Sequence, residues 1–169
     1  MHQTLNKLIT FILILKILIF SRVFALSSDS EEPIYIYSDT QSLNMKTGTV
    51  VFDGNVHLRQ GSIRLNADKV IVTRPSGKKG SEIIDASGKP AEFEQTMDDG
   101  KKMIGKAYDL QYEVDKSFLR MRNHAVLTQE GGNKIEGQLI SYQIDKQQLV
   151  AESDVNGRVT TILQPHTKQ

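Results

Sequence analysis

Histidine is the first residue type to consider for chemistry in this chain, because imidazole binds metals and exchanges protons near neutral pH. Of the four histidines, His57 and His124 lie far from both ends. Each follows an asparagine, Asn55 or Asn123, by one or two residues in a similar turn context. Structural equivalence of His57 and His124 across an internal repeat is the simpler explanation, and a shared metal site is the alternative. No zinc or calcium motif with ligand spacing supports the metal site.

Known catalytic motifs are absent from the sequence. There is no cysteine, which excludes a thiol nucleophile, a redox pair and a thiolate zinc site. No serine nucleophile elbow and no glycine-rich phosphate loop occurs. The pair Asp98-Asp99 precedes Gly100 and is typical of a hairpin turn rather than of paired catalytic carboxylates. We therefore expect a binding protein rather than an enzyme.

A basic loop is a candidate for ligand recognition. Arg74, Lys78 and Lys79 flank Pro75 and Gly77, and this composition disfavours both a helix and a central strand. Cationic side chains at the mouth of an apolar groove would suit an amphiphile with phosphates and acyl chains. The alternative is an ordinary solvated loop.

An internal repeat shows which elements would position such a groove. Leu110-Gln-Tyr-Glu-Val-Asp-Lys116 is echoed by Ile140-Ser-Tyr-Gln-Ile-Asp-Lys146, and a leucine follows each copy three residues later. Each copy alternates apolar and polar residues, so alternate side chains lie on opposite faces of a strand. Such a unit buries its apolar face by stacking on neighbours. Tyr112 and Tyr142 hold equivalent places in the wall of this groove, and a third copy is predicted at residues 43–52 with a one-residue slip.

The chain after Pro33 is predicted to form strands and turns almost throughout. Alternating or β-branched runs bounded by Gly, Asn and Asp favour strands. Turns or loops are predicted at residues 53–55, 60–61, 74–80, 98–101 and 130–134, and a last strand at 158–163. Turn signals without a helical period indicate an all-β sandwich, jelly roll or short β-solenoid. Long strands with exposed edges would also be templates for adding another strand.

The first 25 residues have the pattern of a cleaved signal peptide. Lys7 precedes an apolar run at residues 8–20, which Lys16 interrupts, and Val23-Phe24-Ala25 offers a signal-peptidase site. The run is shorter than the roughly 20 residues that span a bilayer, so an uncleaved anchor is the less favoured alternative. A flexible polar leader is expected at residues 26–32, one domain at 33–165 and a tail at 166–169.

Net charge and cysteine content limit which partners the chain can bind and which cellular compartment suits it. Three of the 21 Lys and Arg residues lie in the first 25, which leaves 18 against 20 Asp and Glu. A near-neutral domain is a poor candidate for nucleic acid binding. An exported chain without disulfides must be held by its core and its hydrogen-bond ladder, which favours the bacterial periplasm over a eukaryotic secretory route.

Five segments, taken in order, carry a family resemblance: Pro33-Ile-Tyr-Ile-Tyr-Ser-Asp39, Phe52-Asp-Gly-Asn-Val56, Asn66-Ala-Asp-Lys-Val-Ile-Val-Thr-Arg-Pro75, Gly88-Lys-Pro-Ala91 and Arg158-Val-Thr-Thr161. Together they resemble the OstA-like family of lipopolysaccharide export proteins, over almost the whole chain after the signal. The third segment is the most specific.

The resemblance implies a periplasmic, open, twisted antiparallel β-jelly roll with an apolar groove. In this family, molecules join head to tail by edge-strand pairing, and lipopolysaccharide passes along the groove from the inner to the outer membrane. The implied partners are lipopolysaccharide, inner-membrane LptC, outer-membrane LptD and further copies of the chain. No cofactor is implied, because ATP is hydrolysed by the inner-membrane transporter.

The resemblance also suggests which residues bind lipid and which assemble. The expected lipid contacts are Ile34, Ile36, Phe93 and Tyr112, with Arg74 near the phosphorylated head group. The expected edge-pairing residues are Ile34, Tyr35, Ile36 and Tyr37 at one end, and Val159, Thr161 and Leu163 at the other. For the apolar members, ordinary core packing is the alternative.

Three other functions fit parts of the pattern. A membrane-anchored LptC-like component would share the fold but keep an N-terminal anchor. A carbohydrate-active enzyme on a jelly roll would need an Asp/Glu pair clustered in its groove. A scaffold would bind no ligand at all.

Overall fold

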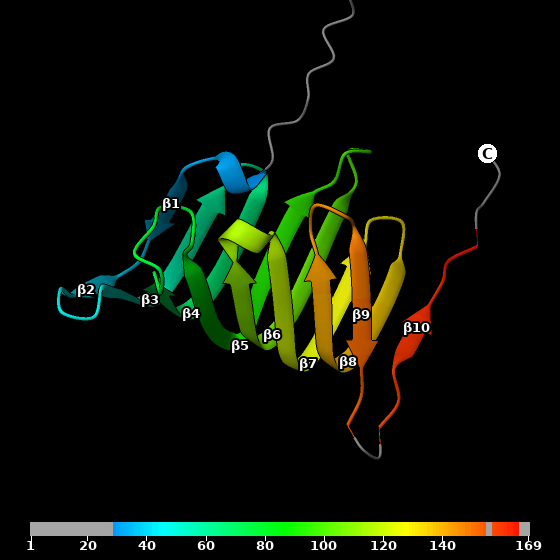
Figure 1. Cartoon of the computed structure of the whole chain (residues 1–169). Helices are drawn as coiled ribbons and strands as arrows, with labels where there is room; N and C mark the ends of the chain where they lie inside the picture. The colour runs from blue at the N-terminus through cyan, green and yellow to red at the C-terminus, as the bar shows by residue number, and fades with distance from the viewer. Residues whose placement is uncertain (1–28, 155–156, 166–169) are drawn as a thin grey trace, which may run out of the picture.

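An antiparallel β-sheet forms the framework of residues 29–154 and 157–165, the part of the chain that the computed structural model describes (Figure 1). Its strands are β1 (Ile34–Tyr37), β2 (Thr40–Asn44), β3 (Thr49–Gln60), β4 (Ile63–Thr73), β5 (Ile83–Thr96), β6 (Lys102–Glu113), β7 (Phe118–Gln129), β8 (Asn133–Gln143), β9 (Gln148–Glu152) and β10 (Thr160–Ile162). Two 3-10 turns, η1 (Asp29–Glu31) and η2 (Val114–Lys116), accompany them. The predicted signal peptide and tail lie outside the described residues.

Strands β3 to β8 follow one another in space as they do in sequence. The sheet order is β1-β3-β4-β5-β6-β7-β8-β10, with β2 added beside β3 and β9 beside β8. Alternation explains why these segments are strands, since Val56, Leu58 and Gln60 are buried while His57 and Arg59 between them are exposed. The predicted all-β fold is confirmed.

A β-bulge interrupts each pairing between neighbouring long strands near its middle. The register shifts lie at Asp53/Val56, Asn66/Lys69, Ser87/Ala91, Lys106/Asp109 and Arg122/Ala125. Because a bulge bends its strand, five bulges side by side fold the whole sheet over along one line (Figure 1). We call this line the bulge column. It turns the sheet into two facing layers, as expected for an open β-jelly roll.

Each layer consists of one half of every long strand and two short strands. The first layer contains β2, β9 and residues 49–53, 69–73, 83–87, 109–113, 118–122 and 139–143. The second layer contains β1, β10 and residues 56–60, 63–67, 91–96, 102–107, 125–129 and 133–137. The strands cross between layers at the bulge column. Their hairpin turns lie at the opposite edge, which we call the seam.

The predicted turn at residues 53–55 is wrong, because β3 continues through them and forms its bulge there. Gly54 and Asn55 have φ values of 81° and 46°. Positive φ suits both a tight turn and a bulge, so the residue pattern alone could not separate them. Asn123 and His124, at 63° and 59°, occupy the bulge of β7. The bulges of β3 and β7 therefore correspond, with Gly54 aligned to Asn123 and Asn55 aligned to His124. The predicted equivalence of His57 and His124 is wrong, because His57 lies in the strand beyond its bulge.

The two histidines have separate neighbours. The His57 Nδ1 atom is 2.7 Å from Asn66 Oδ1, and the His124 ring packs against Tyr108 with centroids 4.8 Å apart. Within the described ranges, no group of three or more histidine, aspartate or glutamate side chains is placed to hold a metal ion.

The internal repeat is a hairpin with a fixed register at the seam. Tyr112 pairs with Leu119 across the β6–β7 hairpin, and Tyr142 pairs with Leu149 across β8–β9. The predicted third copy exists as the β2–β3 hairpin, but there Leu43 pairs with Val50. Leu43, rather than Met45, is therefore the equivalent of the tyrosines, so the predicted alignment of this copy is shifted by two residues.

Each end of the sheet has one edge strand per layer. Strands β1 and β2 bind the two halves of β3, and β10 and β9 bind the two halves of β8. Strand β10 covers Thr160–Ile162, a shorter span than the predicted 158–163. In the described ranges, no helix is long and apolar enough to cross a membrane.

Candidate lipid groove

A groove opens at the end of the molecule where β1, β2 and β3 meet. Its volume is about 590 Å³, within the range of roughly 300–1,000 Å³ that is usual for small-molecule sites. Apolar side chains from both layers form most of its wall: Ile34, Ile36, Val50, Phe52, Val72, Ile84 and Val114. Those of β1 and β3 point inward because they occupy alternate positions of their strands. We call this the N-terminal groove.

Charged residues surround the mouth of the N-terminal groove. Arg74 donates from Nε and Nη2 to the Glu82 Oε1 atom, at 2.9 and 2.6 Å. Lys79 lines the same mouth, together with Glu31 and Glu32. The mouth of the groove therefore carries two cationic side chains and three carboxylates, including Glu82. This balance provides no concentrated positive field, so the apolar wall is the main feature of the site.

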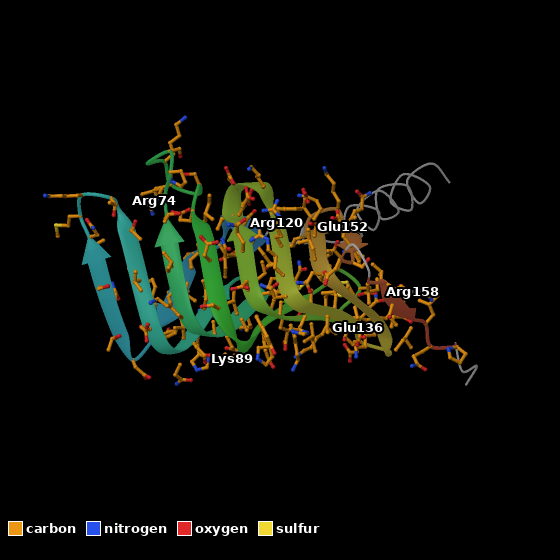
Figure 2. The ribbon with its side chains drawn as sticks, turned by 90° about the horizontal axis from the view of Figure 1, so that it is seen from below. Arg74, Lys89, Arg120, Glu136, Glu152 and Arg158 are labelled. Carbon is orange, nitrogen blue, oxygen red and sulfur yellow. The ribbon has the colours of Figure 1, made fainter. Side chains whose placement is uncertain are left out.

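The predicted lipid contacts lie at two depths. Ile34, Ile36 and Arg74 line the N-terminal groove. Phe93 on β5 and Tyr112 on β6 lie deeper between the layers, with exposed fractions of 0% and 1%. Figure 2 shows Arg74 toward the end formed by β3 and β4, and Glu136, Glu152 and Arg158 toward the opposite end. The buried core continues from the N-terminal groove to Ile140 and Tyr142 of β8, against which Leu149 and Ala151 of β9 pack.

The deeper interior is apolar except near the seam. Large side chains from both layers are fully buried there, among them Leu65, Ile84, Phe93, Leu110, Leu119, Met121 and Ile140. At the seam, the Tyr112 hydroxyl donates to Gln60 Oε1 at 3.0 Å, and the Tyr142 hydroxyl donates to Gln95 Oε1 at 3.3 Å.

The surroundings of both hydroxyls favour the protonated form. Burial raises the pKa of Tyr112 well above its usual range, and the Asp29 carboxylate raises it further. Burial also raises the pKa of Tyr142, with a smaller contribution from Asp98. A small cavity of about 220 Å³ beside these groups is lined by Asp29, Gln95, Tyr112 and their neighbours at the hairpin turns.

Sequence reasoning missed part of the groove. Val50, Phe52 and Val72 belong to runs that were predicted to be strands, and strand alternation together with their place next to β1 could have assigned them to the wall. Gln60 could not have been found this way, because it stands next to Gly61 and resembles an ordinary turn residue.

An open β-jelly roll whose apolar interior is accessible at one end defines a class of proteins that bind amphiphiles. Comparisons with known proteins agree with this class. Residues 35–148 match the family described as LptA/(LptD N-terminal domain) LPS transport protein. Over 146 residues the chain is 47% identical to the lipopolysaccharide export system protein LptA of Escherichia coli K12, covering 86% of this chain and 78% of that protein. LptA of Haemophilus influenzae is 44% identical over 150 residues, covering 88% and 87%.

A solved structure shows the same fold. The crystal structure of LptH from Pseudomonas aeruginosa, described as the LptA-homologous periplasmic component of a lipopolysaccharide transport device, superposes with a TM-score of 0.74. The match covers 82% of this chain and all of that chain, at 30% identity. The chain therefore belongs to the LptA/LptD N-terminal domain family of lipopolysaccharide transport proteins. This confirms the resemblance and the expectation of a transport protein rather than an enzyme.

Proposed function

We propose that this chain is a periplasmic lipopolysaccharide-binding bridge protein that carries lipopolysaccharide from the inner to the outer membrane. The observation that supports it most is the N-terminal groove, which continues into an apolar interior between two layers. Acyl chains gain roughly 0.8 kcal/mol for each methylene that leaves water. An apolar wall without fixed polar contacts lets such chains bind and also move on.

The ends of the sheet support assembly into a longer conduit. Each layer ends in an edge strand on both sides, and edge strands present unpaired N–H and C=O groups. Tyr35 and Tyr37 on β1 are 46% and 63% exposed, and Leu163, just after β10, is 74% exposed. Copies of the chain would join by β-augmentation, β1 and β2 of one against β9 and β10 of the next. By the same contacts, one terminal copy would meet LptC and the other LptD.

The test is photo-crosslinking from two neighbouring positions of β1. A benzoylphenylalanine at Ile36 points into the N-terminal groove, whereas one at Tyr37 points to solvent, because strand neighbours alternate. With purified protein and lipopolysaccharide, we expect an adduct at Ile36 and little at Tyr37. No adduct at Ile36, or equal yields at both positions, would contradict the proposal.

A further inference from the structure

Two buried hydrogen bonds cross the seam from one layer to the other. Tyr112 and Tyr142 belong to the first layer, at the tips of the two repeat hairpins. Their acceptors, Gln60 and Gln95, belong to the second layer. All four side chains are buried, and Gln95, the most exposed, is 8% exposed. The bonds therefore join the two layers at the edge opposite the bulge column.

The N-terminal segment holds the two glutamines in orientation. The Gln60 Nε2 group donates to the backbone carbonyls of Ser30 and Glu32, both at 3.1 Å. The Gln95 Nε2 group lies 3.4 Å from Asp29 Oδ2. Each amide thus has its nitrogen directed to residues 29–32, which directs its oxygen to a tyrosine hydroxyl.

Asp29 fixes this segment to the second layer. Its carboxylate accepts hydrogen bonds from the Ser62 backbone N–H at 2.6 Å and from the Ser62 hydroxyl at 2.7 Å. Ser62 lies in the β3–β4 turn, two residues after Gln60. The η1 turn (Asp29–Glu31) is therefore bound to the same edge that the tyrosines reach.

An amphiphile that moves through this interior must keep its sugar head in water while its acyl chains stay between the layers. The part of the lipid that joins the head to the acyl chains must then pass between the edges of the two layers. The seam is the edge where no backbone segment joins the layers. The Tyr112–Gln60 and Tyr142–Gln95 hydrogen bonds cross the seam. Phe93, which lies deeper, has no exposed surface, so the layers must also separate to admit an acyl chain there.

We propose that the Tyr112–Gln60 and Tyr142–Gln95 pairs are clasps that hold the seam shut, that η1 secures them, and that both open when a lipid passes. The opening of the clasps during lipid passage rests on the proposed function. The closure of the seam by the clasps does not depend on it, so each of these two claims can be tested and rejected on its own.

Spin-label distances test the closure. Lys101 and Lys146 are exposed, and they lie in hairpin turns that face each other across the seam, where Gln147 Nε2 is 3.3 Å from Asp98 Oδ2. The chain has no cysteine, so K101C and K146C take the labels specifically. We expect a narrow distance distribution in this parent, and a broader one at longer distances once Tyr112→Phe and Tyr142→Phe are added.

The controls separate clasp loss from general loosening. Tyr108→Phe alters a tyrosine beside the bulge column, and should leave the label distances unchanged. Asp29→Ala should lengthen them, whereas Glu31→Ala in the same turn should not. Far-UV circular dichroism establishes that each variant is folded. Distances in the double tyrosine variant that match the parent would overturn the clasps, and unchanged distances in Asp29→Ala would overturn the role of η1.

A covalent lock tests passage. In the K101C/K146C protein, a short bismaleimide links the two turns, and a sample with both cysteines capped by N-ethylmaleimide is the control. Benzoylphenylalanine at Ile36 reports lipopolysaccharide at the N-terminal groove, and at Phe93 it reports the interior. We expect the locked protein to give an unchanged yield of the Ile36 adduct and a several-fold lower yield of the Phe93 adduct. In unlocked protein, Tyr112→Phe together with Tyr142→Phe should make the Phe93 adduct form faster.

The outcomes distinguish the two proposals. Equal Phe93 adducts in locked and capped protein would overturn the role of the clasps in passage. Absence of the Ile36 adduct from every sample, the capped control included, would contradict the proposed function, and the label distances would still decide whether the clasps close the seam.

Discussion

The ring and the hydroxyl of each repeat tyrosine serve different purposes. The rings of Tyr112 and Tyr142 fill the interior, and the hydroxyls satisfy the only acceptor that each facing glutamine side chain has. Among the described residues, no buried side-chain nitrogen or oxygen atom lacks a hydrogen-bond partner. A buried polar group that loses its partner costs more than an average hydrogen bond contributes, so these two contacts are sensitive positions in an apolar interior.

Tyr112→Phe should lower the free energy of unfolding by about 1–3 kcal/mol, because it leaves Gln60 Oε1 buried without a donor. Tyr108→Phe is the matched control, since Tyr108 is 43% exposed, and it should have little effect. Urea titrations followed by far-UV circular dichroism measure both changes. Equal transition midpoints for the two variants would contradict the importance of the buried hydroxyl.

The raised pKa values predict a loss of stability at alkaline pH. In the unfolded chain both tyrosines ionise near 10.0, while in the folded protein their pKa values are higher. The folded state therefore holds its protons more tightly. This contribution to stability is complete below pH 10 and is lost as the pH rises toward the folded pKa values.

The free energy of unfolding should therefore fall more steeply above pH 10 in the native protein than in the Tyr112→Phe, Tyr142→Phe variant. Urea titrations between pH 9 and pH 11.5 measure the free energy of unfolding of both proteins. Subtracting one profile from the other removes the contributions of other groups that ionise in this range, because both proteins contain them. Parallel pH profiles for the two proteins would argue against the raised pKa values.

At the scale of elements, the bulge column depends on residues that accept positive φ. At Gly54, whose φ is 81°, an added Cβ would lie 2.5 Å from Asp39 Oδ2 and 3.0 Å from Asp39 Cβ. At Gly48, in the β2–β3 turn, φ is 66° and an added Cβ would meet nothing within 4 Å. Alanine substitutions at Gly54 and Gly48 therefore distinguish the cost of backbone strain alone from the added cost of a steric clash.

Gly48→Ala should cost about 1–2 kcal/mol of stability, the usual strain of a left-handed conformation. Gly54→Ala should cost about 1–3 kcal/mol more, because Asp39 must also move. Thermal unfolding of the two variants, compared at the same pH, gives the difference. If Gly54→Ala were as stable as Gly48→Ala, the contact with Asp39 would not constrain the bulge.

The strands could be predicted from the sequence, because alternation and turn residues are local signals. The bulge at Asp53–Val56 could not, since Gly and Asn at positive φ occur in turns and bulges alike. The clasps were also beyond sequence reasoning. Gln60 and Tyr112 are 52 residues apart, and nothing local marks a turn glutamine as the acceptor of a distant hydroxyl.

At the scale of the whole molecule, the free edges predict self-association. Thr161 is the central residue of β10, and proline there removes an N–H and is poorly tolerated within a paired strand. Thr161→Pro should reduce the growth of molar mass with protein concentration, while Thr161→Val keeps a strand-forming residue and should preserve it. Light scattering over a concentration series measures both. Equal growth for the two variants would exclude β10 from the contact between copies.

The order of pairing also has a consequence for how quickly this chain folds. From β3 to β8 every strand pairs with the next one in sequence, so each of these pairings can begin at a hairpin turn. Proteins whose contacts are local in sequence fold faster than those that join distant segments. The sheet can therefore grow one hairpin at a time, and we expect refolding to be fast for an all-β protein, with β1 and β10 joining after the hairpins beside them have formed.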